Sequence, residues 1–406
     1  MYRTSRIILI STVAFLLVFG LTMLYSTTYY VHGETMLSRQ LLWIVIGAAG
    51  ALSINALDYR ALSRYAGWLL LALALALAYL AAANLLDGRG MPPEVRAFAQ
   101  ALPLVRGLHV GSARWLGISF VRVQPSEFAT LGIILFLGRY FGYHSRHFHT
   151  FYRGFGKPML AVGGVVVLIL LGGDLSTTAI TGAMIFCLSF VAGVRLRFLV
   201  LAGVLGVALA VAAMHASPTR MARFLYYRYP EQYQDNETYQ LWASQLAIGS
   251  GGWRGLGFTE SRMKRRYLPE AHTDFIVAIA GEELGFAGIA LLLLLYATMI
   301  FSILWIGAMA ADREGVLICS GVALALGLRA FVNIGVVGGF LPTTGVTAPL
   351  ISYGGSSAVA SLLGVGLVLN VGKVAHRIAM ETALDRPQPA PPPSRHLSHR
   401  DAVSAD

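Results

Sequence analysis

The chain has 406 residues, of which 56% are hydrophobic and only 13% are charged. This composition excludes a soluble globular protein, because so much apolar surface needs lipid as its solvent. The formal net charge of +11 would suit a nucleic-acid-binding protein. However, Lys and Arg stand at the ends of apolar runs, so we expect a membrane protein with no nucleic-acid partner.

Ten apolar runs approach the roughly 20 residues that a membrane-spanning helix needs. They lie near 7–25, 40–57, 65–86, 126–142, 159–173, 175–192, 196–215, 275–308, 315–338 and 350–371. The first run resembles a signal peptide, but more runs follow it, so it is predicted to be an uncleaved helix. The eighth exceeds a single span, and Gly281 and Gly285 could bend it. The sequence predicts an all-α polytopic membrane protein of about ten helices.

The orientation of these helices is predicted by Lys and Arg, which are in excess in short cytoplasmic loops. Every second short connection is basic, so both termini are expected in the cytoplasm. The connections expected on the outer side are 26–39, 87–125, 172–174, 216–274 and 339–349. Residues 1–380 are expected to form one membrane domain, and the Pro-rich residues 381–406 a disordered cytoplasmic tail.

The two longest outer loops, 87–125 and 216–274, carry many cations, among them Arg114, Lys264 and Arg265. Long loops can escape the orientation rule, which would explain these charges without a function. Because they accompany a dense set of other polar residues, we favour the interpretation that they meet an anion outside the membrane.

The most informative stretch runs from Tyr267 to Phe275 at the expected outer end of the eighth run, and contains Glu270, His272 and Asp274. A carboxylate at such a boundary is partly desolvated, which raises its proton affinity and suits it to act as a general base. The alternative is that Asp274 or its neighbour Thr273 caps a helix.

Glu282 and Glu283 lie deeper in the same run, where ionisable residues are costly and usually functional. Their presence shifts the balance toward a functional site. The alternative for this polar core is a structural pair with Arg329 of the ninth run.

A second polar stretch joins Gly111–Leu116 to Val123–Phe128. Pro125 suits the first turn of a helix, and Glu127 would complement the N-terminal dipole of that helix. Arg114 is either an interfacial anchor beside a tryptophan or a phosphate ligand with paired N–H donors.

A third polar stretch leads into the tenth run and ends in Gly354-Gly355-Ser356-Ser357. Irregular backbone at membrane depth is tolerated where it lines a cavity or is buried in protein. Ser356 and Ser357 are therefore candidates for substrate contact, although small residues also serve helix packing.

The turn Gly172-Gly173-Asp174 separates the fifth and sixth runs, which are either two short helices or one re-entrant pair. Asp174 is a weaker candidate, because a solvated turn residue would explain it. The sequence predicts no metal site, since the histidines of the loop 143–158 have no carboxylate or cysteine beside them.

The strings GSARWL, VQPSEF, YLPEAHTDF, GEELGF and APLISYGGSS occur in the order found in the SEDS family, which comprises FtsW, RodA and SpoVE. The chain resembles this family over nearly its whole length, and the stretches 267–275 and 341–357 resemble division-type FtsW more than elongation-type RodA. The resemblance implies a ten-helix peptidoglycan glycosyltransferase that polymerises lipid II at the outer face of the cytoplasmic (inner) membrane. It also implies a class B penicillin-binding transpeptidase and other divisome proteins as partners.

The resemblance implies that Asp274 is the catalytic carboxylate, and it places Arg114 and Glu127 in the substrate site. Two departures from the family pattern stand out. Thr130 replaces a Lys three residues after Glu127, which removes a phosphate contact. Gly172-Gly173 replace an acidic or Gln residue followed by Pro, which should loosen a turn near the cavity.

The predicted reaction begins when Asp274 takes the proton from the acceptor sugar's 4-hydroxyl group. Arg114 and the cations of 262–266 would neutralise the departing polyprenyl diphosphate. No cofactor motif is present, although a divalent cation, Mg²⁺ or Mn²⁺, could assist. Residues expected to contact substrate are Arg114, Glu127, Lys264, Arg265, Glu270, His272, Ser356 and Ser357.

Two other functions remain open. A transporter that flips lipid II would use Glu282, Glu283 and Arg329 as a polar path, but the sequence shows no inverted repeat. A scaffold without chemistry would be compatible with the two departures from the family pattern.

Overall fold

A computed structural model describes most of the chain. The described residues are 2–32, 35–88, 91–106, 108, 112–118, 121–145, 148, 150–215, 221–222, 224–225, 227, 238–265 and 267–384.

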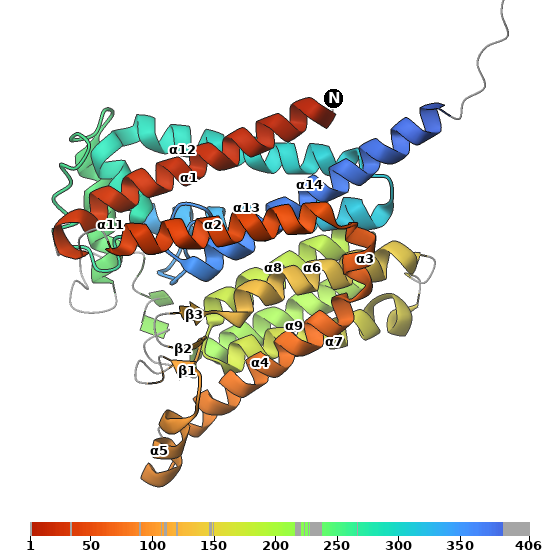
Figure 1. Ribbon diagram of the computed structural model, residues 1–406. Coiled ribbons are helices and arrows are strands. Elements are labelled where there is room, and N and C mark those ends of the chain that lie inside the picture. The colour runs from red at the N-terminus through yellow and green to blue at the C-terminus, as the bar shows by residue number, and fades with distance from the viewer. Residues whose placement is uncertain are drawn as a thin grey trace, which may run out of the picture.

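Helices occupy all ten ranges that the sequence predicted (Figure 1). They are α1 (Tyr2–His32), α2 (Thr35–Ala56), α4 (Ala66–Leu86), α6 (Pro125–Tyr143), α7 (Lys157–Leu171), α8 (Leu175–Val191), α9 (Leu196–His215), α12 (Ile276–Ala308), α13 (Arg313–Val337) and α14 (Gly355–Leu384). Among the described residues, eight helices are long and apolar enough to cross a membrane, one of them α7 extended by the π-helical turn η3 (Tyr152–Gly156). The protein is thus an all-α polytopic membrane protein. The count of ten spans remains a prediction, because α6 and α8 are outside that set.

The helix α13 is the centre of the bundle. It packs against α12 and α14 on one side and against α6 and α8 on the other. Figure 1 shows α1 and α12 above it and α4, α7 and α9 below it. Because α13 contacts both groups, a side chain on it can bridge them.

The two ends of the bundle differ in character. One end carries the start of α1, the end of α14 and the short helix α3 (Tyr59–Arg64) (Figure 1). The other end carries α11 (Tyr239–Gly251), α5 (Pro93–Ala101) and a three-stranded antiparallel sheet. In this sheet β2 (Trp115–Ile118) lies between β1 (Val105–Arg106) and β3 (Val121–Val123). The long loop before the fourth run therefore has structure of its own, which hydropathy did not predict.

The helix α12 is broken at Gly285, whose φ of 65° is readily adopted only by glycine. Four backbone hydrogen bonds of 2.9–3.3 Å join the two sides of the break to segment 252–257. Gly255 allows this approach, because a Cβ there would collide with the carbonyl oxygen of Glu283. The prediction that a glycine bends the eighth run is confirmed. The part that follows Gly285 measures about 34 Å, which matches one bilayer.

The final helix, α14, continues to Leu384, four residues beyond the predicted end of the membrane domain at 380. The rest of the predicted tail, 385–406, lies outside the described residues.

Candidate functional site

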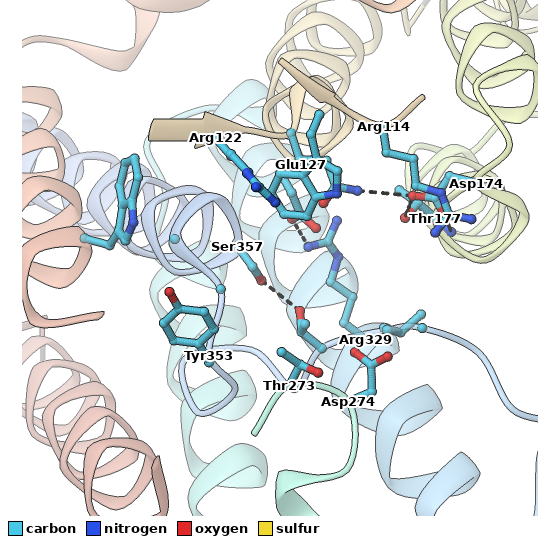
Figure 2. Close-up of a pocket in the computed structure, with 18 of the residues that line it drawn as sticks. Arg114, Arg122, Glu127, Asp174, Thr177, Thr273, Asp274, Arg329, Tyr353 and Ser357 are labelled. Atoms are coloured by element: carbon cyan, nitrogen blue, oxygen red, sulfur yellow. Dashed lines mark hydrogen bonds and ion pairs between the residues drawn. The ribbon is translucent and has the colours of Figure 1, made fainter. Parts of the chain in front are cut away.

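A cavity of about 1020 Å³ opens at the end of the bundle that carries the sheet (Figure 2). Both charge signs line it, and the side chains come from segments far apart in the sequence. The charged residues at its wall are Arg39, Arg114, Arg122, Glu127, Asp174, Glu270, Asp274 and Arg329. Six of these eight were predicted from the sequence: Asp274 as the catalytic residue, Arg114, Glu127 and Glu270 as substrate contacts, and Asp174 and Arg329 as polar core.

Three helices begin at the wall of this cavity. Gln124 precedes α6, Asp174 caps α8, and Gly355 starts α14. The N-terminus of a helix carries a partial positive charge and free N–H groups, which favour a bound anion. Together with the four arginines, these helix ends make the cavity suited to a strongly anionic ligand.

Asp274 lies half-buried at the cavity wall, just before α12 (Figure 2). Burial raises the pKa of its carboxyl group to about 7, with a further upward contribution from the negative charge of Glu270. Arg114 lowers the pKa and Asp174 raises it by smaller amounts. A carboxyl group with this pKa can accept a proton near neutral pH. The helix-cap alternative is not supported, because α12 shows no side-chain cap.

The backbone of Asp274 is fixed by Asn333 of α13. The Asn333 side-chain amide donates hydrogen bonds to the carbonyl oxygens of Asp274, at 2.8 Å, and Val346, at 2.7 Å. Asn333 is buried. One amide group therefore ties two irregular segments of the cavity wall to a buried helix.

Asp174 and Arg114 form a second polar group (Figure 2). The Asp174 carboxylate accepts hydrogen bonds from Thr177, through its amide at 3.1 Å and its hydroxyl at 2.8 Å, and from Gln124 at 3.1 Å. Arg114 Nη1 lies 3.9 Å from the same carboxylate. The interpretation of Asp174 as a solvated turn residue is wrong, since it is buried and caps α8 at the cavity.

The Gly172-Gly173 turn is tight, contrary to the prediction that it would be loosened. Gly173 has a φ of 87°, and a Cβ there would lie 3.1 Å from the Ser112 side chain. The Gly173 carbonyl accepts a hydrogen bond of 2.7 Å from Arg114. The two runs that flank the turn are separate helices, α7 and α8, which pack against each other.

Glu127 and Arg329 form an ion pair between α6 and α13. The alternative in which Arg329 pairs with Glu282 or Glu283 is therefore wrong. The reason is that both glutamates are bound to the loop before α12, Glu283 to Lys264 and Glu282 to the backbone amide of Arg262. Arg329, expected only in a polar core, lines the cavity.

Lys264, predicted to bind substrate, is buried elsewhere. Its ammonium group donates hydrogen bonds to Glu283, at 2.7 Å, and to Ser26 of α1, at 2.8 Å. Glu282 accepts hydrogen bonds from the Ser261 hydroxyl and from the backbone amides of 262 and 263. Both glutamates thus hold the loop before α12, and none of these residues lines the cavity.

Three other predicted contacts lie beside the cavity and not at its wall. Arg265 is exposed on the loop surface. His272 accepts a 3.0 Å hydrogen bond from the Tyr353 amide through its own carbonyl oxygen. Ser356 is buried and accepts a 3.0 Å hydrogen bond from the Gln124 amide, which joins the starts of α14 and α6. Only Ser357 of the serine pair reaches the wall.

Arg39 and Arg122 line the cavity and are exposed; sequence reasoning missed Arg39 and included Arg122 only among the cations of the loop 87–125. Arg39 is one helical turn from Trp43, and both lie on the cavity face of α2. An arginine one helical turn from a tryptophan at the outer end of an apolar run was the sequence signal that could have identified Arg39. Arg122 is placed by β3, where it pairs across the sheet with Gly117.

The described residues offer no cluster of metal ligands. They contain no group of three or more His, Cys, Asp or Glu side chains close enough to hold a metal ion. The carboxylates of Asp174, Glu127 and Glu270 are engaged with arginines, threonines and Gln124.

The chain matches known proteins over most of its length. A family model described as "Cell cycle protein" and covering FtsW, RodA and SpoVE matches residues 5–377. The probable peptidoglycan glycosyltransferase FtsW of Thioalkalivibrio sulfidiphilus is 38% identical over 354 residues, which are 85% of this chain and 81% of that protein. Stage V sporulation protein E of Bacillus subtilis is 36% identical over 279 residues, which are 68% and 76% of the two chains.

Solved structures agree with this match. A chain from a peptidoglycan synthase complex, studied for the coordination of polymerization and crosslinking, gives a TM-score of 0.71 at 29% identity and covers 91% of this chain and 98% of its own. Rod shape determining protein RodA of Thermus thermophilus gives 0.63 at 27% identity and covers 91% and 96%. The ordered strings in the sequence, the shared arrangement of helices and the length of the match lead to one conclusion: this protein is a member of the FtsW/RodA/SpoVE family.

Proposed function

We propose that this enzyme polymerises lipid II, the lipid-linked disaccharide-peptide, in the cavity around Asp274. Relatives from several bacteria are named "Probable peptidoglycan glycosyltransferase FtsW", and the chain is an enzyme of this class. The observation that carries the proposal is a half-buried carboxyl group with a pKa of about 7 in a cavity lined by four arginines. Such a cavity offers a base for a sugar hydroxyl and cations for a diphosphate.

In the proposed reaction, Asp274 removes the proton from the 4-hydroxyl group of the acceptor sugar. The oxygen attacks the anomeric carbon of the growing chain, and the bond from that carbon to the diphosphate oxygen breaks. Negative charge grows on the departing polyprenyl diphosphate. Fixed cations aimed at this charge stabilise the transition state more than the ground state.

The cations available for this task differ from those that the sequence suggested. Arg114 remains, while Arg39, Arg122 and Arg329 replace the cations of 262–266. Arg39 and Arg122 have no carboxylate partner among the described residues, so their charge is available to a ligand. A divalent cation would fit best as a counterion held mainly by the diphosphate, because Mg²⁺ needs only one or two protein carboxylates in such sites.

The lipid tail has an apolar route to the cavity. Leu42 and Ile46 of α2 line the wall and are exposed on the outside of the bundle, where lipid would lie. Val121 and Ile180 contribute further apolar surface to the same cavity. A prenyl chain can therefore leave the cavity sideways into the membrane while its headgroup stays at the arginines.

The cellular setting is part of the same proposal. Lys and Arg in the short connections at the end opposite the cavity, among them Arg60, Arg64, Arg195 and Arg197, support placing both termini in the cytoplasm and the cavity on the outer face of the cytoplasmic membrane. The likeness to a synthase complex that combines polymerization and crosslinking supports a class B penicillin-binding transpeptidase as partner, with other divisome proteins. The FtsW names of the relatives support a role in cell division.

The proposal is tested by reconstituting the pure protein in vesicles with labelled lipid II, with and without a transpeptidase partner. Glycan polymer is the expected product. Movement of lipid II between leaflets without polymer would indicate a transporter, and neither result would indicate a scaffold. A parallel sample treated with EDTA and then supplied with Mg²⁺ or Mn²⁺ tests the divalent cation: we expect loss and recovery of polymer.

The pH dependence of polymerisation follows from the raised pKa of Asp274. The base works only as a carboxylate, so kcat/KM should rise with pH through a midpoint of about 7. Because the charge of Glu270 helps to raise this pKa, Glu270→Gln should move the midpoint to lower pH. Initial rates across the range would show both effects, and an unshifted midpoint near the ordinary aspartate value would contradict this account.

The hydrogen bonds from Asn333 predict an effect on turnover. Asn333→Asp removes both N–H donors and turns a carboxylate oxygen toward the carbonyl oxygens of Asp274 and Val346. Displacing the base by even 1 Å should lower kcat about 10²-fold. KM for lipid II should change little, because Asn333 does not line the cavity. An equal change in both constants would point to a general loss of structure instead.

A further inference from the structure

Glu127 and Arg329 form an ion pair at the wall of the large cavity. Both side chains are about nine-tenths buried, with 9% of each exposed. Glu127 starts from α6 and Arg329 from α13, and both line the large cavity. The pair is therefore a cross-link between α6 and the central helix α13 at the wall of the proposed diphosphate site.

A second, small cavity of about 20 Å³ lies against the same pair. Thr130 lines it together with Glu127 and Arg329. Residues three apart on a helix lie on one face, so a side chain at 130 points toward the space beside the Glu127 carboxylate. Thr130 supplies no charge there, since its hydroxyl group donates a 3.2 Å hydrogen bond to the carbonyl oxygen of Ser126.

Two positions can therefore place a cation beside Glu127, one on α6 and one on α13. In this chain the cation comes from α13. Among the described residues, Glu127 is the hydrogen-bond partner of Arg329, and the other N–H groups of the guanidinium remain for a ligand in the cavity. An arginine has five N–H donors in a planar fork, so one edge can bind the carboxylate and another an oxygen of a diphosphate.

We propose that Arg329 is a diphosphate-binding residue, and that Glu127 is the positioning residue that holds its guanidinium at the cavity wall. This inference rests on the proposed function for its ligand, a polyprenyl diphosphate. The site needs the cation beside Glu127, and either helix can deliver it.

The test moves the charge from one helix to the other. Arg329→Gln removes it, Thr130→Lys supplies it from α6, and the double variant does both. We expect Arg329→Gln to lower kcat/KM for lipid II roughly 10²-fold, and the double variant to recover most of this loss. Arg265→Gln, which removes an exposed cation outside the cavity, is the matched control and should retain full activity.

A double variant that removes both charges, called here the neutral pair, separates an effect on folding from an effect on function. Arg329→Gln alone leaves Glu127 as an uncompensated buried charge and can destabilise the protein. Glu127→Gln together with Arg329→Gln removes both charges, so this variant should keep the thermal unfolding midpoint of the unmodified protein but not its activity. Full activity of Arg329→Gln or of the neutral pair overturns the proposal. The proposal is also overturned if the variant that combines Arg329→Gln with Thr130→Lys folds but is no more active than Arg329→Gln alone.

The ligand is tested without the polymerisation assay. Inorganic diphosphate should stabilise the detergent-solubilised, unmodified protein. This stabilisation should be lost in Arg329→Gln and in the neutral pair, and it should return when Thr130→Lys is added to Arg329→Gln. If the unmodified protein makes no polymer but shows this pattern, the proposed function fails and the anion site stands. If polymer forms but diphosphate stabilises all variants equally, Arg329 is not part of the site.

Discussion

Replacing Asp274 with Asn is expected to lower the turnover number for lipid II polymerisation about 10³-fold. The amide has nearly the same shape as the carboxyl group but cannot accept the proton of the attacking hydroxyl. Asp274 is half-buried at the cavity wall, and its backbone is fixed by Asn333 independently of its side chain. The measurement is the initial rate of polymer formation from purified lipid II at a pH above about 7.

The structure offers a matched control for this substitution. Glu270 is an exposed carboxylate on the same wall, four residues away, and its side chain accepts a 2.9 Å hydrogen bond from Thr273. Glu270→Gln should retain most of the activity at a pH well above the midpoint. Thermal unfolding of Asp274→Asn should match or exceed that of the unmodified protein, since a buried carboxyl group has been neutralised. Polymerisation at the full rate would remove Asp274 from the reaction.

Replacing Lys264 with Met is expected to lower the free energy of unfolding by about 3–5 kcal/mol, because Glu283 would be left as a buried charge without a cation. The side chains of Lys264 and Glu283 are only 2% and 0% exposed. Ser26 of α1 accepts from the same ammonium group, so the substitution also weakens the contact between α1 and α12. Thermal and denaturant unfolding in detergent would measure the loss.

The next residue provides the comparison. Arg265 is exposed, and Arg265→Met should change the free energy of unfolding by no more than about 0.5 kcal/mol. Adding Glu283→Gln to Lys264→Met should restore part of the stability, because the two charges act as one unit. If Lys264→Met and Arg265→Met were equally stable, the buried network would have no energetic role. A loss of activity without loss of stability in Lys264→Met would return Lys264 to the substrate site.

Hydropathy was sufficient to locate the helices, because an apolar run long enough to span a bilayer has few alternatives to a helix. It also located the ends of these runs, where Glu127, Asp174 and Asp274 stand. Since helix ends on one side of a membrane meet in space, these three residues converge on one cavity. That part of the site followed from sequence with little knowledge of packing.

The partners of these residues could not be predicted in the same way. Lys264 and Arg265 are neighbours of the same charge, and only the fold turns one into the core and leaves the other outside. Arg329 had carboxylates available on α6 and α12, which both pack against α13, and it pairs with Glu127 because Glu282 and Glu283 are bound to the loop before α12. Burial and helix adjacency are properties of the packed bundle, so charge and periodicity along one chain do not determine them.

The break at Gly285 bears on how the chain is inserted during synthesis. A carboxylate in the middle of a spanning helix disfavours insertion by roughly 2.5–3.5 kcal/mol, and Glu282 and Glu283 would together add about twice that to a continuous helix. Because the backbone changes direction immediately after them, they travel with the polar loop, and the span starts at Phe286. The insertion machinery therefore meets an uninterrupted apolar segment as far as Ala308, and the glutamates find their cation only after the loop has folded back.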